Sequence, residues 1–233
     1  SQIFDTGGFE MAARRLIRLH AQIADELSVH LPELDLGGGY GIAYTSAHTP
    51  IATGLLAEEL AAICAREFKA IGDGDNLRVP RVSIEPGRAI AGPSTFTLYE
   101  VGTVKAVSLD SGHTRTYVSV DGGMSDNARP ALYEADYSCT LASRHSEAPP
   151  MLSRVVGRHC ESGDIVVLDE YLPADLGPGD LVAVPGTGAY CRALSSQYNH
   201  TPRPPVLAVR DGRARVIVRR ETIDDILALD VPD

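Results

Sequence analysis

Apolar and polar positions follow two different periods in the first ninety residues. Over residues 8–30, and again after residue 50, apolar side chains recur every three or four positions with polar ones between them, which predicts two amphipathic helices. The short runs Leu34-Asp35-Leu36 and Arg81-Val82-Ser83-Ile84 have the length of buried strands. Helices that alternate with such strands predict βαβ units on a parallel sheet.

The second helix has candidate residues for both of its ends. Thr49 and Pro50 suit the N-cap and the first helical position, and Gly72-Asp73-Gly74-Asp75 is expected to end the helix. Two strand–helix steps fall far short of the eight in a closed parallel barrel. This part of the chain is therefore either a small open sheet or the last portion of a barrel whose earlier strands lie outside this chain.

The pattern changes after Gly92-Pro93. Short runs rich in β-branched and other apolar residues, separated by Gly and Pro turns, predict an all-β second domain over residues 94–233. These runs cover residues 95–108, 115–120, 154–157, 165–168, 181–184, 206–209 and 213–219. A closing helix is expected over residues 221–229.

Composition excludes several classes of partner. The 233 residues carry a net charge of −10 at pH 7, without a basic run, so binding to nucleic acid or to anionic lipid is disfavoured. No apolar run approaches the roughly 20 residues of a membrane helix. Four cysteines without paired spacing and dispersed histidines favour reduced thiols in a cytoplasmic protein and indicate no metal site.

Two turns that follow the predicted strands carry candidate chemistry. Gly37-Gly38-Gly39-Tyr40-Gly41 follows the first strand, and glycine backbone can surround a phosphate with its amides; a bare tight loop explains it equally well. Glu85-Pro86-Gly87-Arg88 follows the second strand. Arg88 offers a planar fork for a carboxylate or phosphate, and the alternative is a surface turn with a solvated Arg. Their positions at consecutive strand ends favour phosphate binding.

A polar loop over residues 121–133 interrupts the predicted β domain. Polar loops that carry Arg and Tyr are often functional. Arg129 can bind a carboxylate and Tyr133 can hydrogen-bond to it, whereas the alternative is an ordinary long turn.

Cys160 and Glu161 lie side by side in a turn between two predicted strands, followed by Ser162-Gly163-Asp164, which is ordinary turn chemistry. A lone cysteine is commonly buried and inert. A thiol at a loop tip can instead serve as a general acid, or as a nucleophile if a base such as His159 lies close. Tyr190, in a loop of small residues, either reaches a ligand or packs in the core.

These motifs together resemble one family. They occur in the order found in diaminopimelate decarboxylases, pyridoxal-phosphate enzymes of the alanine-racemase-like barrel class. The motifs are Gly-Gly-Gly-Tyr-Gly (37–41), Glu-Pro-Gly-Arg (85–88), Asp-Gly-Gly-Met-Ser-Asp-Asn (121–127), Cys-Glu-Ser-Gly-Asp (160–164) and Gly-Ala-Tyr (188–190).

The resemblance implies a fold and a reaction. Residues 1–93 would be the C-terminal portion of a (β/α)8 barrel that binds pyridoxal 5'-phosphate. Residues 94–233 would form a β-sandwich or β-barrel-like domain that completes the active site of the partner subunit in a homodimer. The reaction would remove CO₂ from meso-2,6-diaminopimelate to give L-lysine, the last step of lysine biosynthesis.

The resemblance also implies which residues contact the cofactor. The backbone at Gly38 and Gly39 and the turn Glu85-Pro86-Gly87-Arg88 would hold its phosphate. Tyr190 would face both the cofactor and the substrate. Cys160 would donate a proton to the reacting carbon across the dimer interface.

A second set of residues would bind the substrate. Arg88, Arg129 and Tyr133 would bind chiefly its distal carboxylate. Glu161 would take the ammonium beside that carboxylate, and Tyr190 would complete the contact. A lysine-like diamine has no distal carboxylate and would not need the Arg.

Two features of the resembled family are missing from this sequence, the lysine that holds the cofactor and a histidine that stacks on the cofactor ring. Its members hold the cofactor on a lysine in an early barrel strand, and Lys69 and Lys105 do not match that context. We therefore expect the chain to be the C-terminal portion of a longer enzyme. The alternatives are a related decarboxylase of the ornithine or arginine type, or a racemase, and a non-catalytic module of the same fold.

Overall fold

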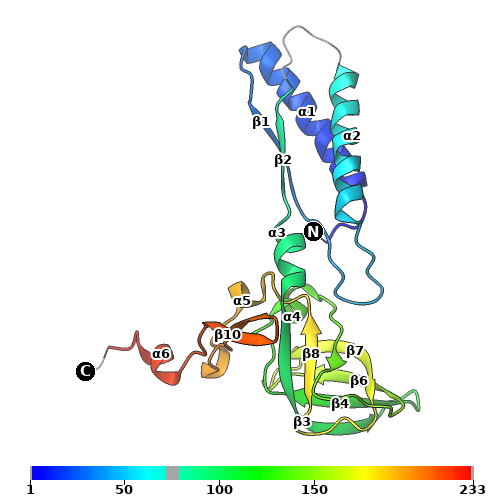
Figure 1. The fold of residues 1–233 in the computed structure, drawn as a ribbon, viewed down its shortest axis with the longest axis vertical. Coiled ribbons are helices and arrows are strands. Elements are labelled where there is room, and N and C mark those ends of the chain that lie inside the picture. The colour runs from blue at the N-terminus through cyan, green and yellow to red at the C-terminus, as the bar shows by residue number, and fades with distance from the viewer. Residues whose placement is uncertain (1, 72–78, 232–233) are drawn as a thin grey trace. The chain divides into compact units, whose positions relative to one another are not determined.

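A computed structural model describes residues 2–71 and 79–231. The chain divides into two compact units, Ser1–Pro93 and Ser94–Asp233 (Figure 1). Each unit has its own elements and its own core.

The first unit packs two long helices on a parallel pair of strands. Helix α1 (Gly7–Leu27) contacts α2 (Thr53–Ile71), and β1 (Glu33–Gly38) pairs in parallel with β2 (Arg81–Glu85). Both predicted strands and the first predicted helix are confirmed. Their core is apolar and consists of Phe9, Ala13, Ile17, Leu34, Leu36, Tyr40, Leu60, Ile63, Cys64 and Phe68.

The predicted start of the second helix is wrong, and its predicted end falls outside the described residues. Helix α2 begins at Thr53 rather than at Pro50, because its first backbone bond runs from Leu56 N–H to the Ala52 carbonyl. The turn before it is folded instead around His48, whose Nδ1 accepts from the amides of Tyr44 and Thr45. The predicted end of this helix, at residues 72–75, lies outside the described residues.

A buried carboxylate ties the two long helices together. Glu67 of α2 accepts hydrogen bonds from Arg14 of α1 at 3.0 and 3.1 Å. These bonds hold the pKa of Glu67 below its ordinary value, since Arg14 stabilises the charged form. The helix pair thus satisfies its buried charge internally.

Strand β2 stays largely uncovered. Its apolar residues Val82 and Ile84 are 39% and 41% exposed, whereas the strands of parallel sheets are normally buried on both faces. Two strands alone do not make a stable sheet in water. The described residues of this unit therefore leave an apolar face of β2 exposed.

The second unit is built on one mixed sheet of six strands, in the order β5-β8-β3-β4-β6-β7. The strands are β3 (Phe96–Ser108), β4 (Thr114–Val120), β5 (Thr140–Leu141), β6 (Pro150–Val156), β7 (Ile165–Pro173) and β8 (Leu181–Pro185). All pairings are antiparallel except β4 with β6.

This sheet nearly closes on itself. Its two end strands, β5 and β7, are in contact, and Cys139 N–H donates to the Glu170 carboxylate of β7 at 3.3 Å. Val118, Val155 and Val182 are fully buried inside it. The predicted β domain is confirmed, and these six strands form a single curved sheet rather than two stacked ones.

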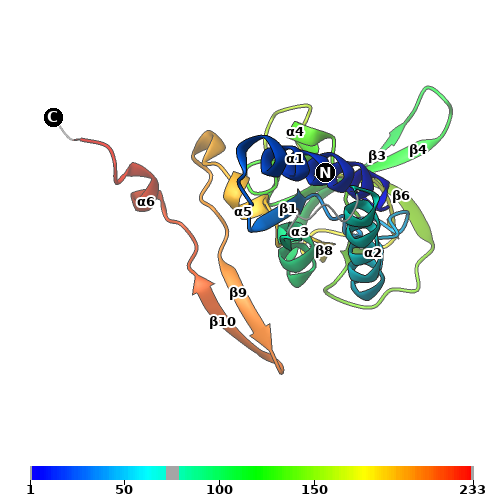
Figure 2. The ribbon, with the colours of Figure 1, turned by 90° about the horizontal axis from the view of Figure 1, so that it is seen from above.

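A separate hairpin and several short helices complete the second unit. Strands β9 (Val206–Arg210) and β10 (Arg213–Val218) pair as a two-stranded ribbon (Figure 2). The closing helix is α6 (Ile223–Leu227), shorter than predicted, and begins with a capping box between Thr222 and Asp225. The pattern did not predict α4 (Arg129–Tyr133), α5 (Cys191–Leu194) or the 3₁₀ turns η1 (Gly92–Ser94) and η2 (Tyr198–His200).

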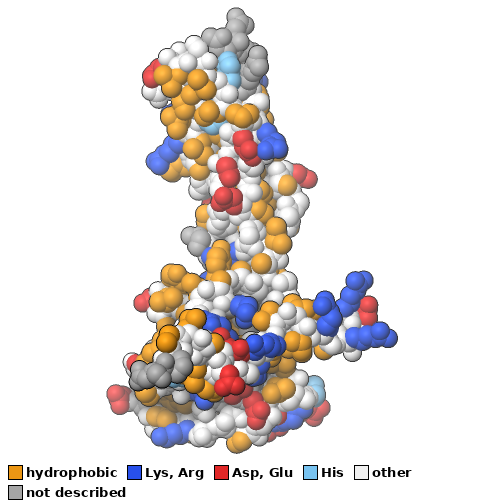
Figure 3. Space-filling view, turned by 90° about the vertical axis from the view of Figure 1, so that its left-hand side faces the viewer, with side chains coloured by type: hydrophobic (Ala, Val, Ile, Leu, Met, Phe, Trp, Pro, Cys, Tyr) orange, Lys and Arg blue, Asp and Glu red, His pale blue; other side chains and the backbone are white. Residues whose placement is uncertain are grey.

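The surface mixes all classes of side chain. On the face that Figure 3 shows, acidic, basic and apolar side chains lie interspersed over much of the molecule. None of the described helices is both long enough and apolar enough to cross a membrane.

The turn between β7 and β8 is held by one guanidinium. Arg144 forms two bonds of 2.9 Å to the Asp180 carboxylate and one of 2.8 Å to Asp175. The hydrogen bonds from Arg144 lower the pKa of Asp180 to about 2. A carboxyl whose folded pKa is depressed stabilises the fold above its unfolded pKa, and this contribution is lost as pH falls toward the folded value.

We expect Arg144→Gln to lower the free energy of unfolding at pH 7. The difference from wild type should stay constant between pH 5 and 8. It should shrink below about pH 4, where the unfolded carboxyl protonates. Urea unfolding across this pH range measures it, with Arg210→Gln as the control, because the Arg210–Asp211 pair is almost fully exposed. An undiminished difference at the lowest pH would contradict the assignment.

Candidate active site

A polar loop, residues 121–128, lies between β4 and α4 of the second unit. Asp126 accepts from the Gly123 amide at 2.7 Å and from the Tyr99 hydroxyl. Burial raises the pKa of both Asp126 and Tyr99. The loop is therefore fixed from within by a buried carboxyl–phenol pair.

A second buried carboxylate joins this loop to the turn that carries Cys160. Asp164 is 3% exposed and accepts from the Met124 amide at 2.6 Å and the His159 amide at 2.7 Å. Gly123 and Gly157 lie so close that a Cβ on either would overlap the carboxylate. Asp164, interpreted from the sequence as an ordinary turn residue, is instead the joint between two loops.

Cys160 and Glu161 project from that joint. Both are exposed, whereas Cys64, Cys139 and Cys191 are buried, so Cys160 is not a buried thiol. The Tyr198 hydroxyl donates to Glu161, and this bond raises the pKa of Tyr198.

The neighbouring histidine does not activate the thiol in this arrangement. His159 is buried, and its Nε2 lies 2.9 Å from the Ser125 hydroxyl. Its ring packs edge-on against Tyr198, with centroids 5.3 Å apart. Among the described residues no hydrogen bond joins the His159 ring to Cys160.

Arg129 forms a buried cluster with aromatic rings beside the same loop. It is 6% exposed, donates to the Tyr137 hydroxyl at 2.5 Å, and lies 5.5 Å and 5.9 Å from the ring centres of Tyr137 and Tyr190. The Tyr137 oxygen in turn lies 3.6 Å from the Cys191 sulfur, and burial raises the pKa of both groups. The guanidinium is thereby held rigidly.

Tyr190 and Tyr133 differ in how they are placed. Tyr190 has φ 70°, a backbone conformation that costs energy for a residue with a Cβ and is common at functional sites, and its ring is 47% exposed. Tyr133, at the end of α4, is 63% exposed. The structure thus brings Tyr190 to Arg129 but leaves Tyr133 in solvent.

The first unit brings its own predicted residues together at the ends of β1 and β2. Gly38 is aligned with Glu85, and a Cβ at Gly38 would lie 2.7 Å from the Glu85 carbonyl oxygen. Gly39 has φ 104°, which requires glycine. Pro86 precedes α3 (Gly87–Ala91), so the predicted turn is also the start of a short helix.

Arg88 is buried within that helix. It donates to the Gln2 side chain at 2.8 Å and lies 6.0 Å from the centre of the Tyr44 ring. A Cβ at Gly87 would meet open space. Side-chain-free backbone at two adjacent strand ends, with an Arg close by in sequence, fits the phosphate end of pyridoxal phosphate. Lys69 and Lys105 are exposed on α2 and β3.

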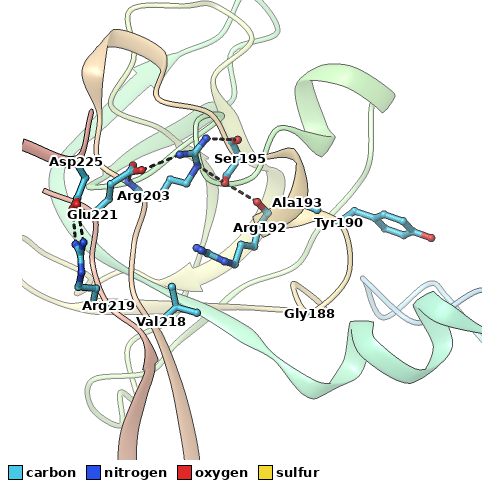
Figure 4. Close-up of a pocket in the computed structure, with 10 residues that line it drawn as sticks. All are labelled: Gly188, Tyr190, Arg192, Ala193, Ser195, Arg203, Val218, Arg219, Glu221 and Asp225. Atoms are coloured by element: carbon cyan, nitrogen blue, oxygen red, sulfur yellow. Dashed lines mark hydrogen bonds and ion pairs between the residues drawn. The ribbon is translucent and has the colours of Figure 1, made fainter. Parts of the chain in front are cut away.

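An open pocket of about 780 Å³ lies entirely within the second unit (Figure 4). Tyr190 and Arg192 line one part of it, and Arg203 and Glu221, paired at 3.0 Å, line another. Sequence reasoning found only Tyr190 here. The pairing of Arg203 with Glu221 joins residues 18 positions apart, and no local motif marks it.

The fold and these sites define a two-domain class, in which a parallel α/β unit with glycine-lined strand ends precedes a mixed β domain with an exposed thiol–carboxylate turn. The chain belongs to the family of pyridoxal-dependent decarboxylases, whose C-terminal sheet domain matches residues 44–188. The resemblance seen in the motifs is thus confirmed at the level of the family.

Individual relatives agree. Diaminopimelate decarboxylase of Corynebacterium efficiens is 53% identical over 231 residues, covering 99% of this chain and 50% of that protein. The enzyme of the same name from Bacillus subtilis is 41% identical, covering 100% and 51%. The crystal structure of diaminopimelate decarboxylase from Helicobacter pylori complexed with L-lysine matches with a TM-score of 0.80 at 31% identity, covering 99% and 52%. The chain therefore spans about half the length of these relatives.

We expect Asp164→Asn to loosen the turn that carries Cys160. The amide group of Asn would face one of the two backbone donors at Met124 and His159, so one hydrogen bond to a charged acceptor is lost. Protection of these two amides from hydrogen exchange should fall about 10- to 100-fold, the scale of such a bond. Ser162→Ala, on the same turn, is the matched control. Unchanged protection at both amides would contradict the conclusion that Asp164 joins the two loops.

Proposed function

We propose that this chain is the C-terminal part of an enzyme that uses pyridoxal phosphate to decarboxylate meso-diaminopimelate to L-lysine and CO₂. The observation that carries the proposal is the pair Cys160–Glu161. Both side chains are exposed on a turn that the buried carboxylate of Asp164 fixes. The same unit holds Arg129, whose guanidinium is already fixed by its aromatic neighbours. The names of the relatives support the same substrate.

In this proposal the first unit is the end of a (β/α)8 barrel. The exposed apolar side chains of β2 support it, since the strands of parallel sheets are normally buried on both faces. The enzyme would be a homodimer in which the β domain completes the partner's site. The three buried free thiols suit a reducing, cytoplasmic setting.

The strand ends of the first unit would hold the cofactor. Backbone at Gly38, Gly39 and Glu85–Gly87 would surround the phosphate, and Arg88 would neutralise it. Bound there, pyridoxal phosphate supplies the electron sink that no side chain provides. The lysine that attaches it would come from outside this chain.

Residues of the second unit would bind the distal end of the substrate. Arg129 would bind the distal carboxylate and Glu161 the ammonium beside it, because a zwitterion is best met by one group of each sign. Tyr190 packs against Arg129 and would orient it toward the substrate. Tyr133 and Arg88 would add further contacts to the carboxylate.

Cys160 would act at the other end of the substrate, where CO₂ leaves. Its thiol would donate a proton to the reacting carbon, and Glu161 beside it would fix the distance between the two ends. This division places an acid and a specificity residue on one rigid turn. A non-catalytic module would not require an exposed thiol there.

Removing the acid tests the catalytic role. In the complete enzyme, Cys160→Ala should lower kcat by about 10²- to 10⁴-fold, the usual contribution of a general acid. The KM for diaminopimelate should change little, because the thiol does not bind the distal end. Assays of CO₂ release measure both constants, with Ser162→Ala as the control. Unchanged turnover would remove Cys160 from the mechanism.

A second test addresses the substrate class. Arg129→Gln should raise the KM for diaminopimelate about 10- to 100-fold, through loss of a charge-assisted bond. Activity on ornithine or arginine should stay negligible in wild type and variant alike. Wild-type activity on either of these that equals its activity on diaminopimelate would favour the related decarboxylases instead.

A further inference from the structure

We propose that Tyr198 is a positioning residue for Glu161, and that Glu221, near the end of the chain, holds Tyr198 in place through the loop over residues 195–203. This inference rests on the proposed function, since it assigns Glu161 to the substrate's distal ammonium. Tyr198 itself would not touch the reacting atoms.

The contact between Tyr198 and Glu161 joins an exposed carboxylate to a fixed ring. The Tyr198 hydroxyl donates to one oxygen of Glu161, which leaves the other oxygen for a cationic ligand. Glu161 is exposed, and a free exposed side chain samples several rotamers. One charge-assisted bond selects the rotamer in which the carboxylate is presented.

The ring of Tyr198 is fixed on its other side by His159. The two rings meet edge-on at 5.3 Å and 76°. His159 is held through its Nε2 by Ser125 at 2.9 Å and through its amide by Asp164 at 2.7 Å. Tyr198 therefore contacts both residues that flank Cys160.

The backbone at Tyr198 is also set by neighbours. The Ser196 amide donates to the Ser125 carbonyl at 2.8 Å, and the Tyr198 amide donates to the Ser196 hydroxyl at 3.3 Å. Asn199 and His200 both have φ 52°, an uncommon conformation that persists only where surrounding contacts impose it.

Glu221 anchors the loop on either side of Tyr198, at Gln197 and at Arg203. Its carboxylate accepts from the Gln197 side chain at 2.8 Å and from the Arg203 amide and guanidinium at 3.0 Å each. Arg203 also donates to the Ser195 hydroxyl and carbonyl at 3.0 and 3.2 Å. Figure 4 shows Arg203 between Glu221 and Ser195. The two ends of the loop that carries Tyr198 are thus joined by Arg203, which Glu221 holds in place.

A contact route therefore leads from Glu221 through Gln197 and Tyr198 to Glu161. Its chemical effect would be selective. It would favour ligands with an ammonium at the distal end, such as L-lysine, and would do nothing for a dicarboxylate without amino groups, such as pimelate. A ring that served only packing would show no such selectivity.

The test uses the complete enzyme with Tyr198→Phe, which keeps the ring and removes only the hydroxyl. We expect the KM for diaminopimelate to rise about 10-fold, the scale of one hydrogen bond to a charged group, with kcat unchanged. Calorimetry should show the Kd of L-lysine rising by the same factor and the Kd of pimelate unchanged. Tyr171→Phe is the matched control, because Tyr171 is exposed on β7 and its hydroxyl has no hydrogen bond among the described residues.

Glu161→Gln distinguishes a failure of the positioning role of Tyr198 from a failure of the role assigned to Glu161 itself. If this variant weakens L-lysine binding but Tyr198→Phe does not, the inference is overturned and the proposed function stands. If Glu161→Gln leaves L-lysine binding intact, the assigned role of Glu161 fails and the inference fails with it. The double variant should bind L-lysine no more weakly than Glu161→Gln alone, since Tyr198 acts only through Glu161; additive losses would overturn the positioning role.

Gln197→Ala and Arg203→Gln extend the test along the route. Both should weaken L-lysine binding in the same direction as Tyr198→Phe but by a smaller factor, and neither should affect pimelate. Equal losses for both ligands would mean that the loop supports the fold rather than Glu161, which would overturn the remote part of the proposal.

Discussion

The candidate site depends on one buried carboxylate. Asp164 brings three backbone segments together: the loop at Met124, the strand end at Gly157 and the turn at His159. A buried anion is costly unless donors surround it, and here two backbone amides do so. Only glycine fits at residues 123 and 157, because a Cβ there would overlap this carboxylate. The carboxylate therefore sets both the residue type at these two positions and the distance between the loops. The position of Cys160 follows from this joint.

This arrangement separates rigidity from reactivity. The groups that fix the loops, the buried Asp164 and the partly buried Asp126, are hydrogen-bonded within the fold. The groups that would meet a ligand, Cys160 and Glu161, are exposed. Sites held within a fraction of an ångström need such a supporting shell. Asp164, which the sequence predicted only as an ordinary turn residue, belongs to this supporting shell, and Cys160 and Glu161, which the sequence singled out, are the groups that would act on a ligand.

Periodicity predicted most of the helices and strands, and local motifs supplied Gly38, Arg88, Arg129, Cys160 and Tyr190 as candidate site residues. The sequence could not show contacts between distant segments. Tyr198 and Glu161 are 37 positions apart, and no local motif links the tyrosine hydroxyl to the carboxylate to which it donates. The predicted start of α2 was wrong. Thr49 and Pro50 satisfy the local rules for a helix N-terminus, but the ring of His48 binds the preceding amides and the helix begins only at Thr53.

The exposure of the reactive groups also bears on how the site is completed. A general acid works best where water is excluded, yet Cys160, Glu161 and half of Tyr190 lie open in this chain. The described residues of the second unit leave that side uncovered, and those of the first unit leave an apolar face of β2 exposed. Each unit thus exposes a surface of a different kind, an apolar strand face in the first and a polar turn with a thiol in the second. In the function proposed above, further barrel strands would cover the first surface and a second subunit would cover the second.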